Sequence, residues 1–270
     1  MLEKNKKIFY CDSHLHFSQA VNISDFSKIA PYSWAGLSCA HSKEEFENQI
    51  AQINQININN SSECHLFHSF GIHPQQISSL STMELNHQFD YLQQLLSEKK
   101  LTAIGETGFD FFTEEYKSTS QLQEEFFIKQ INLAQTYNLP VVIHCRKANE
   151  KLFQYSKELK KLPAVLFHSF MGTPIEAKSL LDRGINGFFS FGKQVLNNNK
   201  KVIACVRELP LNRLLCETDA PYQTLKGESF TKIEEIKTVY EAFAGLRKEI
   251  PADKLFQQIN MNFSEFCTII

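Results

Sequence analysis

Short apolar runs alternate with longer amphipathic stretches along this chain. Eight short runs are typical of buried strands, and they span residues 8–11, 34–39, 66–72, 101–105, 140–143, 164–167, 187–191 and 213–216. The longer stretches repeat apolar residues at helical spacing, as at Phe46, Ile50 and Ile53. They predict helices over residues 43–55, 84–99, 120–137, 149–161, 174–183, 199–209, 233–246 and 252–267.

Eight strand-like runs, each followed by a helix-sized segment, indicate one (β/α)8 barrel of the TIM type. A doubly wound open sheet is the alternative, but no glycine-rich phosphate loop follows the first run. We find no repeat and no linker, so residues 1–270 are expected to form a single domain. The Asn-rich segment 52–62 predicts a helix end and a loop, and residues 198–201 predict a surface turn.

Composition narrows the class of protein. The chain has 270 residues, of which 43% are hydrophobic, so it has enough apolar material for a large core. A formal net charge of −2 argues against a broad basic surface for duplex DNA but allows a local phosphate site. Seven cysteines without a CxxC pair argue against a disulfide scaffold or zinc ribbon. Reduced thiols fit a cytoplasmic protein. The apolar run at 8–11 is too short for a signal peptide, and no segment has the length of a membrane span, so we expect no membrane association.

Ionisable residues gather at the carboxyl ends of the predicted strands. His14 and His16 follow the first strand two residues apart, a spacing that points both side chains the same way. The third, fourth, fifth, sixth and eighth strands end at or before His73, Glu106, His144, His168 and Asp219. In a barrel these ends open on one face, where active sites are built. A lone histidine at a strand end is usually structural, but the whole set predicts a metal cluster.

The residue types indicate the chemistry of that cluster. Imidazole and carboxylate together suit zinc, manganese, iron or a magnesium-like ion. Four histidines and two carboxylates exceed what one tetrahedral ion needs, so two ions that share a bridging carboxylate are the simplest arrangement. The remaining histidines are expected to be structural, because they do not lie at the appropriate strand ends: His41, His65, His68 and His87.

These residues lie in segments where the chain resembles the TatD family of metal-dependent hydrolases, within the amidohydrolase-type barrels. The matching segments, in order, are DSHLH (12–16), GIHP (71–74), AIGETGFD (103–110), PVVIHCR (140–146), FHSFMG (167–172) and CETDAP (216–221). Many two-metal amidohydrolases carry a carbamylated lysine at the end of strand four, where this chain has Glu106. That difference favours a TatD-like protein over a lactonase or dihydroorotase.

The resemblance implies two divalent ions (magnesium, manganese or zinc) that share Glu106 as their bridge. By position, one ion would be held by His14, His16 and Asp219, and the other by His144 and His168. Asp219 would also accept the proton of the attacking water. His73 and Arg146 would meet a phosphate, and Glu217 would lie behind the ligands or on the substrate side.

The chain also departs from the family pattern. Residues 169–171 read Ser-Phe-Met, and residues 222–230 lack the proline, Arg-Gly and Asn-Glu-Pro pieces common in the family. This second segment lies on the predicted active-site face, where substrate specificity is decided.

We therefore expect a metal-dependent hydrolase of phosphodiester bonds. It would be a deoxyribonuclease that acts as an exonuclease on the ends of single-stranded DNA, and it would need no obligate protein partner. A hydrolase of a small-molecule amide, lactone or phosphoester is the first alternative. A metal-binding scaffold that has lost catalysis is the second, although the presence of Asp219 argues against it. Four phenylalanines near strand ends are candidates for base stacking, with packing as the stronger interpretation: Phe109, Phe111, Phe112 and Phe170.

Overall fold

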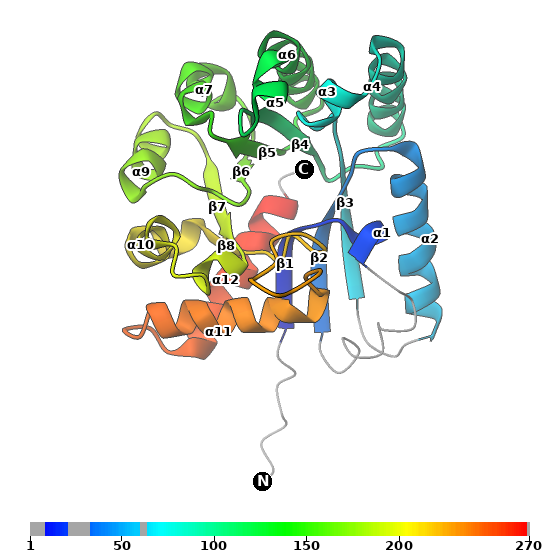
Figure 1. Ribbon diagram of the computed structural model, residues 1–270. Helices are drawn as coiled ribbons and strands as arrows, with labels where there is room; N and C mark the ends of the chain where they lie inside the picture. The colour runs from blue at the N-terminus through cyan, green and yellow to red at the C-terminus, as the bar shows by residue number, and fades with distance from the viewer. Residues whose placement is uncertain (1–8, 21–32, 60–63, 269–270) are drawn as a thin grey trace.

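Eight parallel strands form one sheet in the order β1-β2-β3-β4-β5-β6-β7-β8, with helices around its outside (Figure 1). The computed structural model describes residues 9–20, 33–59 and 64–268. The strands are β1 (Phe9–Leu15), β2 (Ser33–Ala40), β3 (Cys64–Phe70), β4 (Ala103–Asp110), β5 (Val141–Arg146), β6 (Val165–Phe167), β7 (Gly187–Phe191) and β8 (Leu214–Cys216). The predicted (β/α)8 barrel is confirmed.

The described helices follow the strands along the chain. The α-helices are α1 (Phe17–Ala20), α2 (Lys43–Asn59), α3 (Gln76–Ser79), α4 (Thr82–Ser97), α5 (Glu114–Ser118), α6 (Ser120–Tyr137), α7 (Asn149–Gln154), α8 (Ser156–Leu159), α9 (Pro174–Asp182), α10 (Lys200–Glu208), α11 (Ile236–Leu246) and α12 (Ala252–Cys267). Short 3₁₀ turns are η2 (Lys193–Val195), η3 (Leu211–Arg213) and η4 (Ile233–Glu235). Among the described residues, no helix is both long and apolar enough to cross a membrane.

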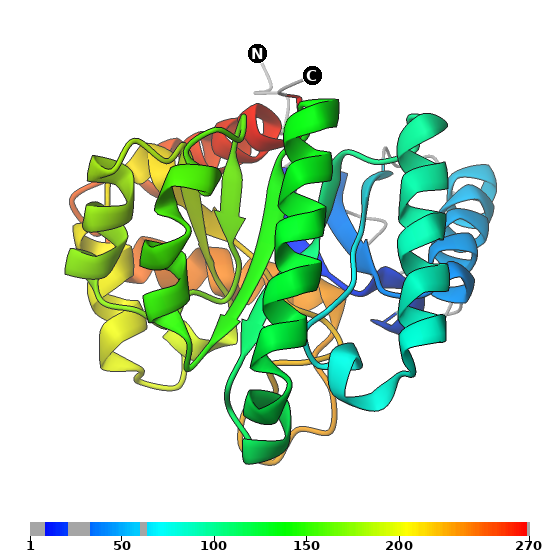
Figure 2. The same cartoon turned by 90° about the horizontal axis from the view of Figure 1, so that it is seen from above.

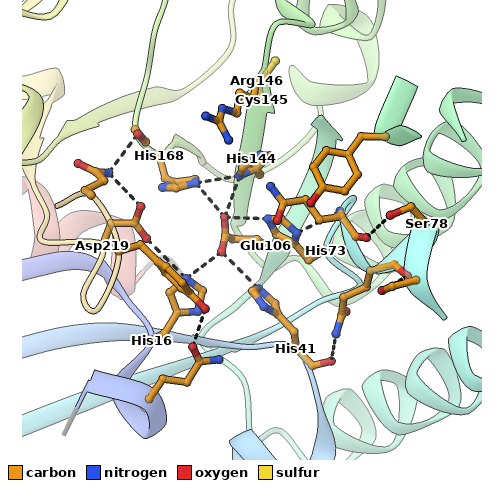
Figure 3. A pocket seen from close by; sticks show the side chains of 18 of the residues that line it. His16, His41, His73, Ser78, Glu106, His144, Cys145, Arg146, His168 and Asp219 are labelled. Carbon is orange, nitrogen blue, oxygen red and sulfur yellow. Dashed lines mark hydrogen bonds and ion pairs between the residues drawn. The ribbon is translucent and has the colours of Figure 1, made fainter. Parts of the chain in front are cut away.

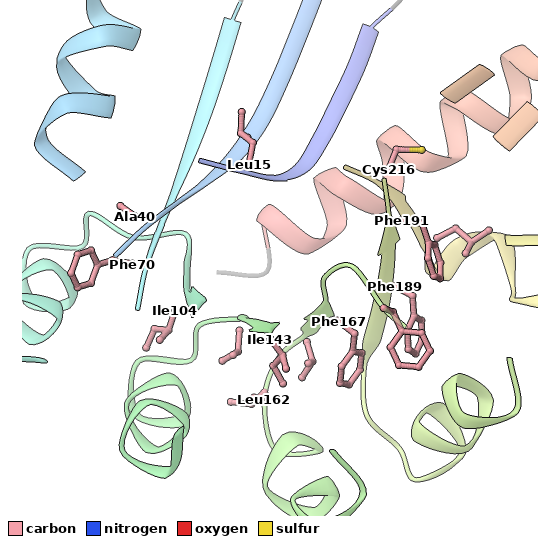
Figure 4. Close-up of a cluster of buried hydrophobic side chains, with 14 of the residues drawn as sticks. Leu15, Ala40, Phe70, Ile104, Ile143, Leu162, Phe167, Phe189, Phe191 and Cys216 are labelled. Carbon is pink, nitrogen blue, oxygen red and sulfur yellow. The ribbon is translucent and has the colours of Figure 1, made fainter. Parts of the chain in front are cut away.

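Apolar side chains pack in two layers, inside and outside the ring of strands. The outer layer lies between strands and helices and includes Phe167 and Phe189, whose rings stack with centroids 5.1 Å apart (Figure 4). The inner layer includes Leu37 and Phe188, and it is completed by Phe266 of α12. In Figure 2, α12 covers the end of the barrel opposite the segment after β8. One end of the barrel is therefore apolar, and the chemistry is confined to the other.

Hydrogen bonds of side chains and backbone connect the end of β8 to β1 and close the barrel. The buried Asp12 carboxylate of β1 accepts hydrogen bonds from Thr218, at 2.9 Å from the backbone nitrogen and 2.6 Å from the hydroxyl. The backbone nitrogen of Asp219 donates to the carbonyl of His14 at 2.9 Å. The same contacts that close the barrel therefore fix Asp219 beside His14.

Several elements end at other residues than the sequence predicts. Strands β1, β4 and β5 continue past residues 11, 105 and 143, so His14, Glu106 and His144 lie within strands. The strand register shifts between Asp12 and Leu15 and between Ile104 and Thr107, next to two of these residues. Such irregularities redirect side chains at barrel rims.

The helix predictions also need correction. The helix expected at 43–55 continues to Asn59 as α2, so it ends within the segment 52–62, where a helix end was expected. Residues 60–62 lie outside the described ranges, as does residue 8. The helix expected at 149–161 is divided into α7 and α8, and the one at 233–246 begins as η4. The turn expected at 198–201 ends early, because the Asn199 side chain caps α10 from Lys200 onward.

The outer layer yields a test of core packing. Replacing Phe189, which is fully buried, should leave a cavity, so Phe189→Ala should lower the free energy of unfolding by about 3–5 kcal/mol. Ile175→Ala is the matched control, because Ile175 is 79% exposed and its loss should change stability by less than about 0.5 kcal/mol. Urea unfolding followed by circular dichroism measures both values. Equal stabilities of the two variants would contradict this assignment of the core.

Candidate metal centre

Glu106 lies at the centre of the polar end of the barrel. It belongs to β4 and is 2% exposed. The neighbouring Gly105 and Gly108 have φ angles of +139° and +142°, and a Cβ atom at either position would collide with a carbonyl oxygen of β5. Glycine at both positions therefore lets β4 lie close to β5 and directs the Glu106 carboxylate into the barrel mouth.

Six imidazole rings surround this carboxylate, three at each oxygen. Figure 3 labels all of these rings except His14. The distances from Oε2 are 3.3 Å to His14 Nε2, 3.4 Å to His16 Nε2 and 3.3 Å to His41 Nε2. The distances from Oε1 are 2.8 Å to His168 Nε2, 3.3 Å to His144 Nδ1 and 3.6 Å to His73 Nε2. The carboxylate thus lies between two groups of histidines.

Asp219 adds a second carboxylate on the Oε2 side. Its Oδ1 lies 3.4 Å from His14 Nε2 and 3.5 Å from His16 Nε2. Its Oδ2 accepts a hydrogen bond from Gln223 at 3.1 Å. Burial alone would raise the pKa of Asp219, but the facing imidazoles of His14 and His16 hold it below its ordinary value. Asp219 is therefore an ionised carboxylate at neutral pH.

The same balance keeps Glu106 ionised. Burial opposes the charged form, yet the positive charges of His14 and His168 hold the pKa of Glu106 well below its ordinary value. The effect is mutual at His168, where burial and His14 lower the pKa but the Glu106 carboxylate outweighs them and raises it to about 10. The buried carboxylate of Glu106 and the buried ring of His168 therefore stabilise each other's charged forms.

The donor set fits divalent metal ions. His14 Nε2 and His41 Nε2 are buried and close to carboxylate oxygens, yet within the described ranges neither forms a hydrogen bond. Nitrogens that converge without hydrogen-bond geometry are free to share a cation. His14, His16 and Asp219 form one group with ligand atoms within 4.8 Å of one another, and Glu106 belongs to three further groups. We read this pattern as a site built for cations.

Outer partners hold several of the rings in place. Cys39 Sγ lies 3.2 Å from His14 Nδ1, and Asp110 Oδ2 lies 3.0 Å from His144 Nε2. Both contacts use the nitrogen that faces away from Glu106, so they orient the other nitrogen toward the centre. Sequence reasoning assigned no role to Asp110 or Cys39, because their positions beside the rings depend on the pairing of β2 and β4 with their neighbours.

Glu217 lies behind His168. It is fully buried, its Oε1 accepts a hydrogen bond from Gln223 at 2.9 Å, and its Oε2 accepts one from Ser190. The His168 Nδ1 atom is 3.7 Å from Oε2. Of the two expected positions for Glu217, the one behind the histidines therefore agrees with its burial, and the one on the substrate side does not.

His73 differs from the other five rings in its hydrogen bonding. Its Nδ1 accepts a hydrogen bond from the backbone nitrogen of Gln75 at 3.1 Å. Burial and the neighbouring His144 lower the pKa of His73 to about 3, so the ring is neutral. A neutral ring that accepts at Nδ1 carries its proton at Nε2. His73 therefore presents an N–H donor, and not a lone pair, to the centre.

His41 corrects the sequence prediction, which treated it as structural. It directly follows β2, which continues to Ala40, one residue beyond the predicted strand. That single residue places His41 at a strand end like the other members of the set. The remaining histidines of that prediction, His65, His68 and His87, do not belong to the cluster.

The centre lies at the base of a cavity of about 820 Å³. Arg146 lies at its exposed rim, with its guanidinium 3.5 Å from the centroid of the Phe112 ring. Phe112 is 44% exposed, whereas Phe109 and Phe170 are buried in the core. Phe111 is partly buried against that core. Of the four phenylalanines, Phe112 alone thus offers an exposed face beside the cavity.

The segment that departs from the family pattern forms one wall of the cavity. Tyr222 packs edge-on against His16, with ring centroids 5.0 Å apart, and its hydroxyl donates to Gln19 at 2.6 Å. Further along, Glu228 pairs with Lys193, which is 1% exposed and also lies 3.0 Å from Glu235. This segment is therefore tied to η2 and η4 while it contacts the centre.

Comparison with known proteins agrees with this geometry. The family model of TatD related DNase matches residues 11–268. A protein of Pantoea ananatis named 3′-5′ ssDNA/RNA exonuclease TatD is 38% identical over 157 residues, which cover 56% of each chain. An uncharacterized metal-dependent hydrolase of Mycoplasma pneumoniae is 30% identical over 222 residues, which cover 79% of this chain and 81% of that protein.

A solved structure extends the likeness to the whole fold. The crystal structure of YJJV, a TatD homolog from Escherichia coli K12, matches with a TM-score of 0.78 and 25% identity, over 96% of this chain and 97% of that one. For three curated relatives, by contrast, the matched part spans little more than half of the relative, from 56% to 60% of its length. On the family model, the centre and the fold together, this chain belongs to the TatD related DNase family.

Proposed function

We propose that this protein is a divalent-metal-dependent hydrolase of phosphodiester bonds that acts as an exonuclease on single-stranded nucleic acid. The observation that carries the proposal is the ionised, buried Glu106 carboxylate with three imidazoles at each oxygen. Membership of the TatD related DNase family supports it, as does the likeness to a named 3′-5′ ssDNA/RNA exonuclease.

Two divalent ions are proposed to bind on the two sides of Glu106. His14, His16 and Asp219 would hold one, His144 and His168 the other, and Glu106 would bridge them. The His168–Glu106 distance of 2.8 Å and the His14–Glu106 distance of 3.3 Å support this division. Such ions polarise a phosphoryl oxygen and lower the pKa of bound water.

The chain itself supplies a proton acceptor and a proton donor. Asp219 is an ionised carboxylate whose Oδ2 is held by Gln223, so it is placed to accept the proton of an attacking water. His73 is neutral with its proton at Nε2, so it can donate a hydrogen bond to a phosphate oxygen, as a backbone nitrogen would in an oxyanion hole. Glu217 acts on His168 and not on substrate.

Arg146 and Phe112 are proposed to hold the substrate at the cavity rim. The guanidinium carries a fork of donors that matches phosphate oxygens, and the exposed Phe112 ring offers a face for a base. The net charge of −2 argues against a broad basic surface, so binding through a few phosphates agrees with a single-stranded end.

We further propose a cytoplasmic location and one domain spanning residues 1–270. All seven cysteines lie in described parts of the chain and are free thiols, which suits a reducing compartment. All eight strands belong to one sheet, which supports a single domain.

Digestion of a single-stranded oligonucleotide tests the activity and its direction. With Mn²⁺ or Mg²⁺, the protein should release labelled mononucleotide from a 3′-labelled strand earlier than from a 5′-labelled strand. A chelator should abolish the release. Asp219→Asn should lose nearly all activity, with a kcat at least about 100-fold lower, because the proton acceptor is removed. Asp90→Asn, a change on the exposed face of α4, is the control with unchanged activity.

The alternatives are separated by the same assay. If metal-loaded protein cleaves no nucleic acid but hydrolyses small amide, lactone or phosphoester substrates, the nuclease proposal fails and the small-molecule hydrolase replaces it. If Asp219→Asn retains the activity of the unmodified protein, the role given to Asp219 is wrong.

Metal content tests the bridge. Glu106→Ala should bind at most one ion per chain where the unmodified protein binds two, because both ions share this carboxylate. Glu265→Ala, an exposed position on α12 at the other end of the barrel, should keep the full content. Mass spectrometry of dialysed protein measures both. Full metal content in Glu106→Ala would refute the bridge.

Kinetics test the rim contact. Arg146→Ala should raise the KM for an oligonucleotide roughly tenfold or more, with a smaller change in kcat, because a charged hydrogen bond to substrate is lost. Arg146→Lys should recover part of the KM, since it keeps the charge without the fork. Arg207→Ala, an exposed position on α10, is the control. A KM unaffected by Arg146→Ala would exclude this contact.

A further inference from the structure

His41 is held firmly beside the centre by its own backbone. Its nitrogen donates to Glu45 Oε2 at 2.7 Å, and its carbonyl accepts a hydrogen bond from Gln76 at 3.1 Å. These contacts come from α2 and α3, on either side of the residue. The backbone at His41 is therefore fixed without any contribution from the imidazole ring.

The ring itself points into the centre (Figure 3). Its Nε2 lies 3.3 Å from Glu106 Oε2, the oxygen that also faces His14 and His16. The side chain is 12% exposed, and its centroid is 5.0 Å from that of His16. A buried nitrogen in this position requires a partner, yet Nε2 forms no hydrogen bond to any part of the chain that the structure describes.

The comparison with His73 shows what that nitrogen can do. His73 accepts a backbone hydrogen bond at Nδ1, so its Nε2 carries a proton and cannot bind a cation. No such contact is described for the His41 Nδ1, so its proton can reside there and leave a lone pair at Nε2. The two rings are neighbours, with centroids 4.8 Å apart, but they present opposite chemistry to the centre.

We propose that His41 is a ligand of the ion on the His14 and His16 side, which gives that site three imidazoles together with the Glu106 and Asp219 carboxylates. The proposal rests on the proposed function in one respect, that the centre holds divalent ions. A set with three nitrogen donors suits zinc and other late transition metals better than magnesium, which prefers oxygen ligands. His41 therefore makes this site selective for zinc or another late transition metal over magnesium.

Metal titrations of three variants of the full chain test this proposal. His41→Ala removes the ligand, His41→Asp replaces its nitrogen with oxygen, and His87→Ala changes an exposed histidine on α4 as the matched control. Calorimetry gives the affinities of metal-free protein for Zn²⁺ and Mn²⁺. The visible absorption spectrum of the Co²⁺-loaded protein reports the ligands around the ion independently of activity.

His41→Ala should weaken the binding of one Zn²⁺ at least about tenfold, since loss of an outer partner of a ligand already costs that much. It should also change the Co²⁺ spectrum, whereas His87→Ala should change neither. His41→Asp should shift the Zn²⁺ to Mn²⁺ affinity ratio toward Mn²⁺. Circular dichroism establishes that each variant is folded.

The results separate this proposal from the proposed function. If the unmodified protein binds no divalent ion, both fail. If it binds two ions and cleaves nucleic acid, but His41→Ala retains its Zn²⁺ affinity and its Co²⁺ spectrum, only the role of His41 is overturned. Should His41→Ala fail to fold, an unchanged Zn²⁺ to Mn²⁺ ratio in His41→Asp overturns it equally.

Discussion

The buried negative charge of Glu106 is the constraint on which the rest of this structure depends. A carboxylate that is 2% exposed is costly unless positive groups or cations compensate it. The chain meets this demand with three imidazoles at each oxygen, drawn from the ends of five different strands, with two of the rings from β1. Each of these strands must therefore end at a level along the barrel axis from which its histidine reaches Glu106. Any rearrangement of those ends would remove an imidazole from the buried carboxylate.

The two sides of Glu106 are alike in number of rings but not in chemistry. On the Oε1 side, His144 is oriented by Asp110, while His73 is turned into a proton donor by the Gln75 backbone. On the Oε2 side, the Nε2 atoms of His14 and His41 form no hydrogen bond with any described residue. The contact behind His73 thus sets this ring, which presents an N–H to the centre, apart from the other rings of the cluster.

The contacts that close the barrel also position part of the centre. The contacts of Asp12 with Thr218 join β1 to the end of β8, and the next residue is Asp219. The same region continues into the wall formed by Tyr222 and Gln223, which contact His16 and Asp219. The segment 222–230, which departs from the family pattern, is therefore in direct contact with His16 and Asp219, which lie in the family motifs.

The sequence by itself determined the eight-stranded barrel and most of the cluster. A buried strand appears in the sequence as a short apolar run, and the polar residues of the cluster directly follow such runs. His14, Glu106 and Asp219 were found in this way. Only the tertiary structure decided the place of His41, since β2 extends one residue beyond its apolar run. It alone also decided that His73 presents an N–H to the centre, because this depends on the hydrogen bond from the Gln75 backbone behind the ring, which no pattern along the chain records.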